Sequence, residues 1–287
     1  MVRRFFMPMK ITNKKLLCES QGVRVVKLDV EAHDIAKSAK AGQFVALMAD
    51  KKGERIPLTI VDKDTAKGTI TLILQEAGLT TKLLGKLNVG DSLYAMVGPL
   101  GHATEIKNYG HIILVGGGVG IAEIYPVAKA LKNAGNHITT ILGSRSKDLL
   151  ILEQELKETS DELHITTDDG SYGRKGFVTD VLKDLLRNTL NAIRYTLIYA
   201  VGPIPMMKRV AGVAGEFNIK TIVSLNSLMV DATGMCGCCR VTVGGEVKFA
   251  CVDGPEFDAA KVDWDELVKR NRIYEIKEKH ICKLDQT

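Results

Sequence analysis

The sequence contains no block of basic residues, no low-complexity tract and no internal repeat. Its 39 lysines and arginines outnumber its 34 acidic residues and give a net charge of +5, but they are scattered and not interleaved with aromatics. Nucleic-acid binding needs clustered positive charge, so this distribution argues against a nucleic-acid partner. A content of 25% charged and 45% apolar residues is typical of a soluble globular protein with a sizeable core.

The sequence also lacks an uninterrupted apolar segment of membrane-spanning length. Its most apolar stretch, residues 111–131, contains Glu123, Pro126, Lys129 and a run of glycines, which is typical of a strand, a turn and a helix. The segment 1–14 begins with arginines, but its apolar part is too short for a signal peptide and has no small-residue cleavage site. We therefore expect a cytoplasmic protein that does not enter a membrane.

Cysteine is scarce before position 236, where only Cys18 occurs. Four of the six cysteines then lie between positions 236 and 251. In a reducing compartment, clustered cysteines are more often ligands or redox groups than structural disulfides. The sequence therefore predicts a bound metal or iron–sulfur group in this segment, whereas Cys18 and Cys282 are expected to stay unligated.

The first part of the chain carries the signals of β-strands. Five apolar and β-branched runs are separated by glycine, aspartate and lysine clusters, and a helix is expected at 80–87. This spacing predicts a closed or nearly closed antiparallel β-barrel. The five predicted strands are 22–30, 42–49, 55–62, 68–78 and 91–98.

After His111, strand and helix signals alternate four times, which is the pattern of an open, doubly wound parallel sheet. The last part holds a short strand, the clustered cysteines, a hairpin around Gly244-Gly245 and a charged helix near 263–278. The predicted fold class is thus β plus α/β. Its three predicted domains are a β-barrel at 1–105, a nucleotide-binding α/β domain at 106–222 and a small C-terminal segment at 223–287.

Glycine and polar residues follow four of the predicted parallel strands. Ligands of such sheets bind where strands end and helices begin, because glycines allow close approach and exposed N–H groups attract phosphate. Ordinary tight turns also contain glycine, and Ile121 breaks a strict GxGxxG pattern. Four such strand ends together favour a dinucleotide site. Its candidate residues are Gly117, Gly118, Gly120, Ser144, Arg145, Asp168, Asp169, Gly170, Gly202 and Pro203. Arg145 suits a 2′-phosphate, but it is equally typical of an exposed arginine beside a helix.

Several segments resemble motifs of the ferredoxin reductase family, in the family's order. "RIPLTI" at 55–60 resembles its flavin motif R-x-P-[FYL]-[ST], and "EAGLTTKLL" resembles the following segment. "LVGGGVGIA", "TDDGSYGRKGFVTDVL" and "YAVGPIPMMK" resemble its pyridine-nucleotide domain, which adds Met206 to the nucleotide candidates. The resemblance implies that FAD binds to the barrel and NAD(H) to the α/β domain. The implied FAD residues are Arg55, Pro57, Leu58, Thr59, Gly78, Thr80 and Thr81. Taken singly, Arg55 is equally a strand-end charge and the threonines a helix cap.

The cysteine frame Asp231-x4-Cys236-x2-Cys239-x11-Cys251 narrows this resemblance. It is similar to the [2Fe–2S] frame of dihydroorotate dehydrogenase electron-transfer subunits, except that aspartate replaces the first cysteine. Small subunits of NADH-dependent reduced ferredoxin:NADP⁺ oxidoreductases share this aspartate, so the resemblance implies these four residues as cluster ligands. Thiolates suit iron–sulfur clusters, and aspartate keeps the ligand charge. Zinc remains an alternative, because ligand spacing rarely separates the two.

The resemblance implies an enzyme subunit that takes a hydride from NADH onto FAD and passes single electrons through the cluster to a larger subunit. That partner would resemble glutamate synthase, with its own FAD, two [4Fe–4S] clusters and an NADPH site, and would react with ferredoxin. No catalytic side chain is expected, because the protein aligns the reactants and the cofactors carry the chemistry. The alternatives are a dihydroorotate dehydrogenase electron-transfer subunit, a stand-alone ferredoxin–NADP⁺ reductase and a zinc-stabilised nucleotide-binding regulator.

Overall fold

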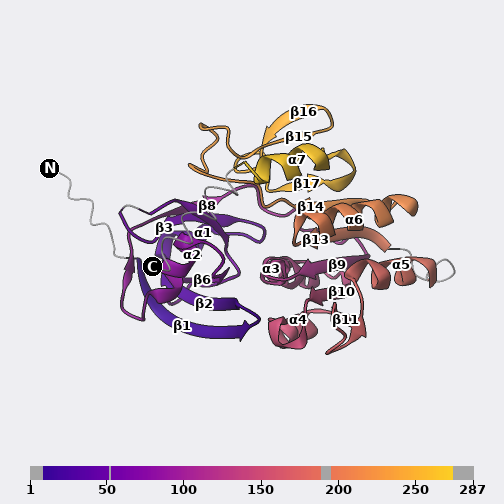
Figure 1. Cartoon of the computed structure of the whole chain (residues 1–287), viewed down its shortest axis with the longest axis horizontal. Coiled ribbons are helices and arrows are strands. Elements are labelled where there is room, and N and C mark those ends of the chain that lie inside the picture. The colour runs from indigo at the N-terminus through magenta and orange to yellow at the C-terminus, as the bar shows by residue number, and fades with distance from the viewer. Residues whose placement is uncertain (1–8, 52, 189–194, 274–287) are drawn as a thin grey trace.

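The computed structural model describes residues 9–51, 53–188 and 195–273. Figure 1 shows a β-rich unit on the left, an α/β unit on the right and a small C-terminal segment above them. No helix within these ranges is long and apolar enough to cross a membrane.

Two antiparallel sheets form the N-terminal unit, in the orders β5-β6-β2-β1-β7 and β4-β3-β8. Alternation along β2 explains the packing: Val26, Leu28 and Val30 enter the core, while Lys27 and Asp29 stay partly exposed. The two sheets thereby enclose one apolar core. The elements are β1 (Met9–Ser20), β2 (Val23–Glu31), α1 (His33–Ser38), β3 (Phe44–Met48), β4 (Ile56–Thr59), β5 (Asp62–Asp64), β6 (Thr69–Gln75), α2 (Leu79–Lys86), β7 (Ser92–Leu93) and β8 (Ala95–Leu100).

Strand β1 is a long strand that the sequence pattern did not predict. Only Ile11 and Cys18 of its residues are buried, so the apolar alternation that signals a strand is missing. Pairing with β2 along most of its length stabilises it instead, with two irregularities in register. Cys18 therefore lies in a strand, away from the other described cysteines.

A seven-stranded sheet forms the α/β unit, in the order β12-β11-β10-β9-β13-β14-β17. All its pairs are parallel except β14 with β17. Strands β10, β11 and β12 are added on one side of β9, and β13 and β14 on the other. The connections therefore leave β9 and β13 in opposite directions, which opens a crevice at their carboxyl ends. The elements are β9 (His111–Gly117), α3 (Gly120–Asn133), β10 (His137–Ser144), η1 (Lys147–Leu149), α4 (Glu153–Thr159), β11 (Glu162–Thr167), β12 (Arg174–Lys175), α5 (Val178–Asn188), β13 (Tyr195–Val201), α6 (Ile204–Glu216) and β14 (Thr221–Ser224).

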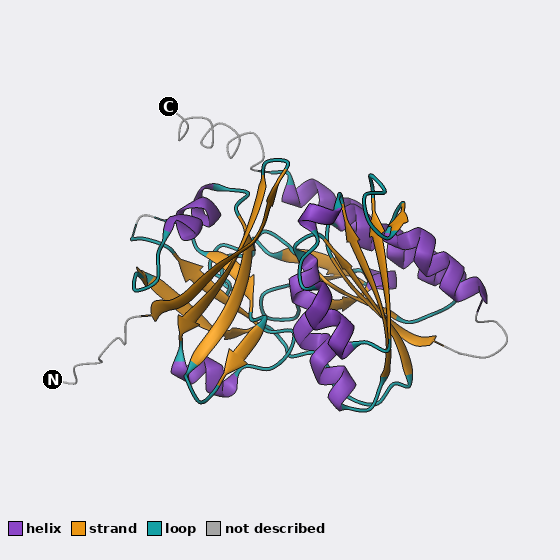
Figure 2. Cartoon of the chain, turned by 90° about the horizontal axis from the view of Figure 1, so that it is seen from below, coloured by secondary structure: helices purple, strands orange, loops and turns teal. Residues whose placement is uncertain are grey.

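Helices cover both faces of this sheet, as Figure 2 shows. Strand β9 is buried on both sides because it is central: Ile112 and Leu114 pack with α3 and α4, whereas Ile113 and Val115 pack with α5 and α6. A continuously apolar strand is the expected signature of such a position. The doubly wound sheet predicted from alternating strands and helices is confirmed.

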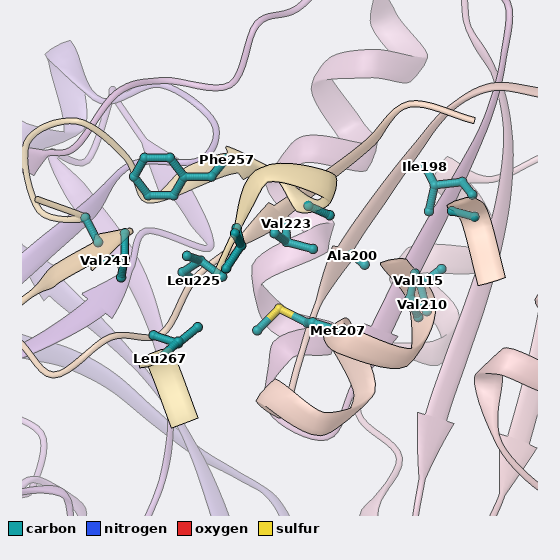
Figure 3. Close-up of a cluster of buried hydrophobic side chains, with 14 of the residues drawn as sticks. Val115, Ile198, Ala200, Met207, Val210, Val223, Leu225, Val241, Phe257 and Leu267 are labelled. Atoms are coloured by element: carbon teal, nitrogen blue, oxygen red, sulfur yellow. The ribbon is translucent and has the colours of Figure 1, made fainter. Parts of the chain in front are cut away.

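The C-terminal segment consists of the hairpin β15 (Arg240–Val243) and β16 (Glu246–Phe249), then β17 (Glu256–Asp258), η3 (Ala259–Lys261) and α7 (Trp264–Asn271). Positive φ angles at Gly244 and Gly245 form the predicted hairpin turn. The segment shares a core with the α/β unit, because Phe257 and Leu267 lie in the same apolar cluster as Met207 (Figure 3). The part of the predicted helix after position 273, and Cys282, lie outside the described residues.

Candidate functional site

A cavity of about 660 Å³ lies at the carboxyl ends of the parallel strands. Nine predicted nucleotide residues line it: Gly117, Gly118, Gly120, Ser144, Arg145, Asp168, Gly202, Pro203 and Met206. Asp169 and Gly170 instead shape the turn after β11, where Asp169 accepts hydrogen bonds from the amide and hydroxyl of Ser171. These bonds lower the pKa of the Asp169 carboxyl. The cavity thus gathers strand ends that are far apart in the sequence.

The glycines of the β9–α3 turn have different physical reasons to be there. A Cβ on Gly120 would lie 2.6 Å from the carbonyl oxygen of Val201, so only glycine lets α3 start this close to β13. Gly118 has a φ of +56° and open space where a Cβ would stand. This turn therefore leaves room at the crevice for a phosphate group to meet the backbone.

Charged residues are few around this cavity. Arg145, Arg209, Asp168 and Glu123 line it. The Arg209 guanidinium lies 5.7 Å from the ring centre of Phe177. Two guanidinium groups suit the phosphates of a dinucleotide, and a carboxylate suits a ribose hydroxyl. Arg145 is exposed as well as lining the cavity, so both interpretations of it remain compatible with its position.

A second cavity, of about 320 Å³, lies between the β-rich unit and the α/β unit. Pro57, Leu58 and Thr59 of the flavin motif line it, together with Thr81 at the start of α2. The Thr81 hydroxyl also accepts hydrogen bonds from the amides of Ala77 and Gly78, so it caps the helix as well. Gly78 has open space around it, whereas Thr80 is buried.

The two cavities adjoin each other. Four residues line both of them: Gln75, Val119, Glu123 and Asn226. A nicotinamide ring in the larger cavity and an isoalloxazine ring in the smaller one would therefore lie next to each other. None of these four was among the predicted site residues. An acidic residue inside the apolar run Ile121–Ile124 was the available signal for Glu123.

The loop that carries the predicted cluster ligands begins at the wall of the smaller cavity. Met229 and Pro255 line that cavity, two residues before Asp231 and four residues after Cys251. Arg55 of the flavin motif reaches the same loop, because its Nη1 donates a 3.1 Å hydrogen bond to the carbonyl oxygen of Asp231. The flavin motif and the cluster loop are thus in direct contact.

The clustered cysteines form two pairs, with Cys236, Cys238 and Cys239 in the loop before β15 and Cys251 in the turn after β16. The sulfurs of Cys239 and Cys251 are 3.1 Å apart and buried, and the thiols of Cys236 and Cys238 interact nearer the surface. Burial and the neighbouring thiol raise the pKa of Cys251 to about 12. Two buried sulfurs this close together suit the thiolate ligands of an iron–sulfur group. The structure does not separate Cys238 from the predicted ligands.

The Asp231 carboxylate faces amides of its own loop. Its two oxygens accept 2.9 Å hydrogen bonds from the backbone N–H groups of Thr233 and Cys236, and these bonds lower its pKa. The side chain is therefore ionised at neutral pH, as a ligand must be. Among the described residues, no three His, Cys, Asp or Glu side chains converge as ligands of a single metal ion.

Three family models match successive parts of the chain. They are the oxidoreductase FAD-binding domain at residues 8–104, the oxidoreductase NAD-binding domain at 114–212, and the iron-sulfur cluster binding domain of dihydroorotate dehydrogenase B at 226–263. The fold and the site thus define a ferredoxin-reductase-like oxidoreductase with FAD, NAD(H) and an iron–sulfur cluster as cofactors. The predicted fold class, enzyme class and cofactors are confirmed.

Individual relatives place the chain further. A dihydroorotate dehydrogenase B (NAD⁺) electron transfer subunit homolog from Thermotoga maritima is 52% identical over 250 residues, covering 87% of both chains. The electron transfer subunit from Fusobacterium nucleatum is 31% identical, over 83% of this chain and 92% of its own length. The chain belongs to the family of dihydroorotate dehydrogenase B electron transfer subunits and their homologues.

Solved structures show the same relationship. A chain from a structure of NADH-dependent reduced ferredoxin-NADP oxidoreductase, described for its insights into flavin-based electron bifurcation, is 46% identical with a TM-score of 0.89. The match covers 99% of this chain and 100% of that one. Ferredoxin-NADP⁺ reductase from Plasmodium falciparum, 16% identical with a TM-score of 0.59 over 72% and 89% of the two chains, shows the shared fold alone.

Proposed function

We propose that the chain is the small, NADH-oxidising subunit of a cytoplasmic NADH-dependent reduced ferredoxin:NADP⁺ oxidoreductase. It takes a hydride from NADH and delivers single electrons to a larger subunit. That partner resembles glutamate synthase, carries its own FAD, two [4Fe–4S] clusters and an NADPH site, and receives electrons from reduced ferredoxin. Bifurcation itself takes place on the larger subunit.

The observation that carries this proposal is the continuity of the site. The larger cavity adjoins the smaller one at Glu123, and the smaller cavity adjoins the cluster loop at Met229 and Pro255. Bound FAD would convert a two-electron donor into a one-electron donor, and the cluster would carry single electrons outward. With these cofactors bound, the adjoining cavities and the cluster loop would form a path from the nicotinamide to the cluster.

The chain's own residues have separable roles along this path. The glycine turn at 117–120 and Met206 position the nucleotide in the crevice, and Thr59 and Arg55 hold the flavin side. Arg55 also fixes the start of the cluster loop through the Asp231 carbonyl. Asp231, Cys236, Cys239 and Cys251 would hold the [2Fe–2S] cluster.

A second candidate is an electron-transfer subunit of dihydroorotate dehydrogenase. The names of several relatives favour it, including those from Thermotoga maritima and Fusobacterium nucleatum. Aspartate in the first ligand position argues for the first candidate, as does the overall similarity to the bifurcating complex. The two candidates share the NADH-oxidising chemistry and differ in the protein that accepts the electrons.

Copurification decides between these candidates. The affinity-tagged full chain is isolated without oxygen from its native host, and the bound subunit is identified by mass spectrometry. We expect a larger flavoprotein related to glutamate synthase, and a complex in which NADP⁺ reduction requires both NADH and reduced ferredoxin. Recovery of a dihydroorotate dehydrogenase, with NAD⁺ reduction driven by dihydroorotate, would establish the second candidate instead.

A further inference from the structure

Glu123 lies in the first turn of α3, at the boundary of the two cavities, and lines both. Among the described residues that line the smaller cavity, it is the only one with an acidic or basic side chain. An ionisable group in this position can exchange a proton with either cavity.

The surroundings of Glu123 disfavour its charged form. The Glu123 side chain is partly buried, its neighbours Ile121, Ala122 and Ile124 are fully buried, and no ion pair among the described residues involves Glu123. Burial raises the pKa of the Glu123 carboxyl to about 7, and interaction with the Thr59 hydroxyl only partly offsets this effect. A carboxyl whose pKa is raised toward neutral pH suits a proton acceptor.

Other ionisable groups near Glu123 cannot take this role as readily. Tyr199 on β13 donates a 2.8 Å hydrogen bond to Glu256, and burial together with the charges of Glu256 and Glu123 raises its pKa well above the usual value. Glu256 is occupied by the hydroxyls of Tyr199 and Thr104 and lines neither cavity. The remaining charged residues of the larger cavity are Arg145, Asp168 and Arg209.

The reaction requires a proton acceptor, given the proposed function on which this inference rests. A hydride consists of two electrons and one proton, whereas an iron–sulfur cluster accepts only single electrons. For every NADH oxidised, two electrons leave through the cluster and one proton stays behind. We propose that the Glu123 carboxylate accepts this proton, with the Thr59 hydroxyl beside it, and releases it to solvent before the next turnover. Electron delivery in the opposite direction reverses the same transfer.

Reaction-induced infrared spectroscopy tests this assignment on the holoprotein. The protein is reduced with NADH and reoxidised with ferricyanide, a one-electron acceptor, in H₂O and in D₂O. The wild type should show a carboxyl C=O band that changes with redox state and shifts in D₂O. Glu123→Gln should lack this band. The control Glu256→Gln removes the other partly buried carboxyl of this region, and this variant should retain the band.

Kinetics give a second measurement. In Glu123→Gln, delivery of electrons to ferricyanide should slow on the order of 10²-fold and lose its dependence on pH between 6 and 8. An unchanged infrared band and pH profile in this variant would overturn the inference. If the variant fails to bind FAD, the wild type alone decides. A wild-type rate of ferricyanide reduction that does not change between pH 6 and pH 8 would then overturn the inference. A wild type that NADH cannot reduce would instead overturn the proposed function, and this inference with it.

Discussion

Asp231 combines two properties at the scale of the single residue: it occupies the first position of the ligand frame, and its oxygens accept amide hydrogen bonds from Thr233 and Cys236. A carboxylate oxygen has a second lone pair, so these bonds and ligation of iron are compatible. They orient the carboxylate and keep it ionised, which is how hydrogen bonds next to a metal ligand act.

Serine substitutions distinguish the predicted ligands from the bystander. Cys236→Ser, Cys239→Ser and Cys251→Ser should each lose the [2Fe–2S] cluster, because each removes a thiolate ligand. Cys238→Ser should keep it and serves as the matched control from the same loop. Iron and sulfide analysis of the purified proteins checks the result. Cluster loss in Cys238→Ser with retention in Cys236→Ser would show that Cys238, and not Cys236, is the ligand.

Replacement of Asp231 tests the fourth ligand. Asp231→Cys should still assemble a cluster, because a thiolate carries the same charge, but the midpoint potential should change with the donor atom. Asp253→Asn is the control, since Asp253 accepts the Phe249 amide in the same segment but lies outside the ligand frame. An EPR-monitored redox titration gives both values. An Asp231→Cys spectrum and potential equal to the wild type would rule out Asp231 as a ligand.

At the scale of elements, the sequence predicted the strands and helices whose buried residues follow a regular pattern along the chain. The alternating strands and helices of the α/β unit were predicted because β9 is apolar throughout and a glycine turn follows it. Strand β1 was missed because pairing with β2, not burial, holds it. Glu123 was missed for a related reason: its position at two cavities depends on β4 and α3, which are distant in sequence.

The turn between β9 and α3 gives a prediction at this scale. In Gly120→Ala, the new Cβ would stand 2.6 Å from the Val201 carbonyl oxygen, which is backbone and cannot rotate away. The protein should lose about 1–3 kcal/mol of stability, and NADH should bind more weakly. Gly212→Ala in α6 has no atom within 4 Å of its new Cβ and should gain about 0.5–1 kcal/mol. Thermal unfolding and NADH titration check both; equal stability of the two variants would contradict the packing argument.

At the scale of the whole molecule, Glu256 joins all three parts of the chain. It lies on β17 of the C-terminal segment, accepts the Tyr199 hydroxyl of the nucleotide sheet at 2.8 Å, and accepts the hydroxyl of Thr104 from the link after β8. The flanking backbone adds to this junction, because Gly254 accepts a 2.7 Å hydrogen bond from the His102 amide. The cavities and the cluster loop are thereby held in one arrangement.

This junction predicts a pH dependence of stability. Burial raises the pKa of Glu256 above its ordinary value of 4.5, so the folded state holds this proton more tightly than the unfolded state does. Its contribution to stability is therefore complete below the unfolded pKa and falls as the pH rises through the folded one. In Glu256→Gln, where the amide oxygen can still accept both hydroxyls, this loss should disappear. Unfolding midpoints of both proteins from pH 4 to pH 8 measure it; parallel curves would contradict the argument.

The path from NADH through flavin to cluster is the central claim, and an anaerobic NADH titration of the purified holoprotein tests it most directly. Visible absorbance follows the flavin, and EPR of samples frozen within milliseconds follows the cluster. We predict that NADH bleaches the flavin first and that the EPR signal of a reduced [2Fe–2S] cluster appears afterwards. Two results would contradict the account. One is a cluster that is reduced before the flavin, and the other is a bleached flavin beside a cluster that is never reduced.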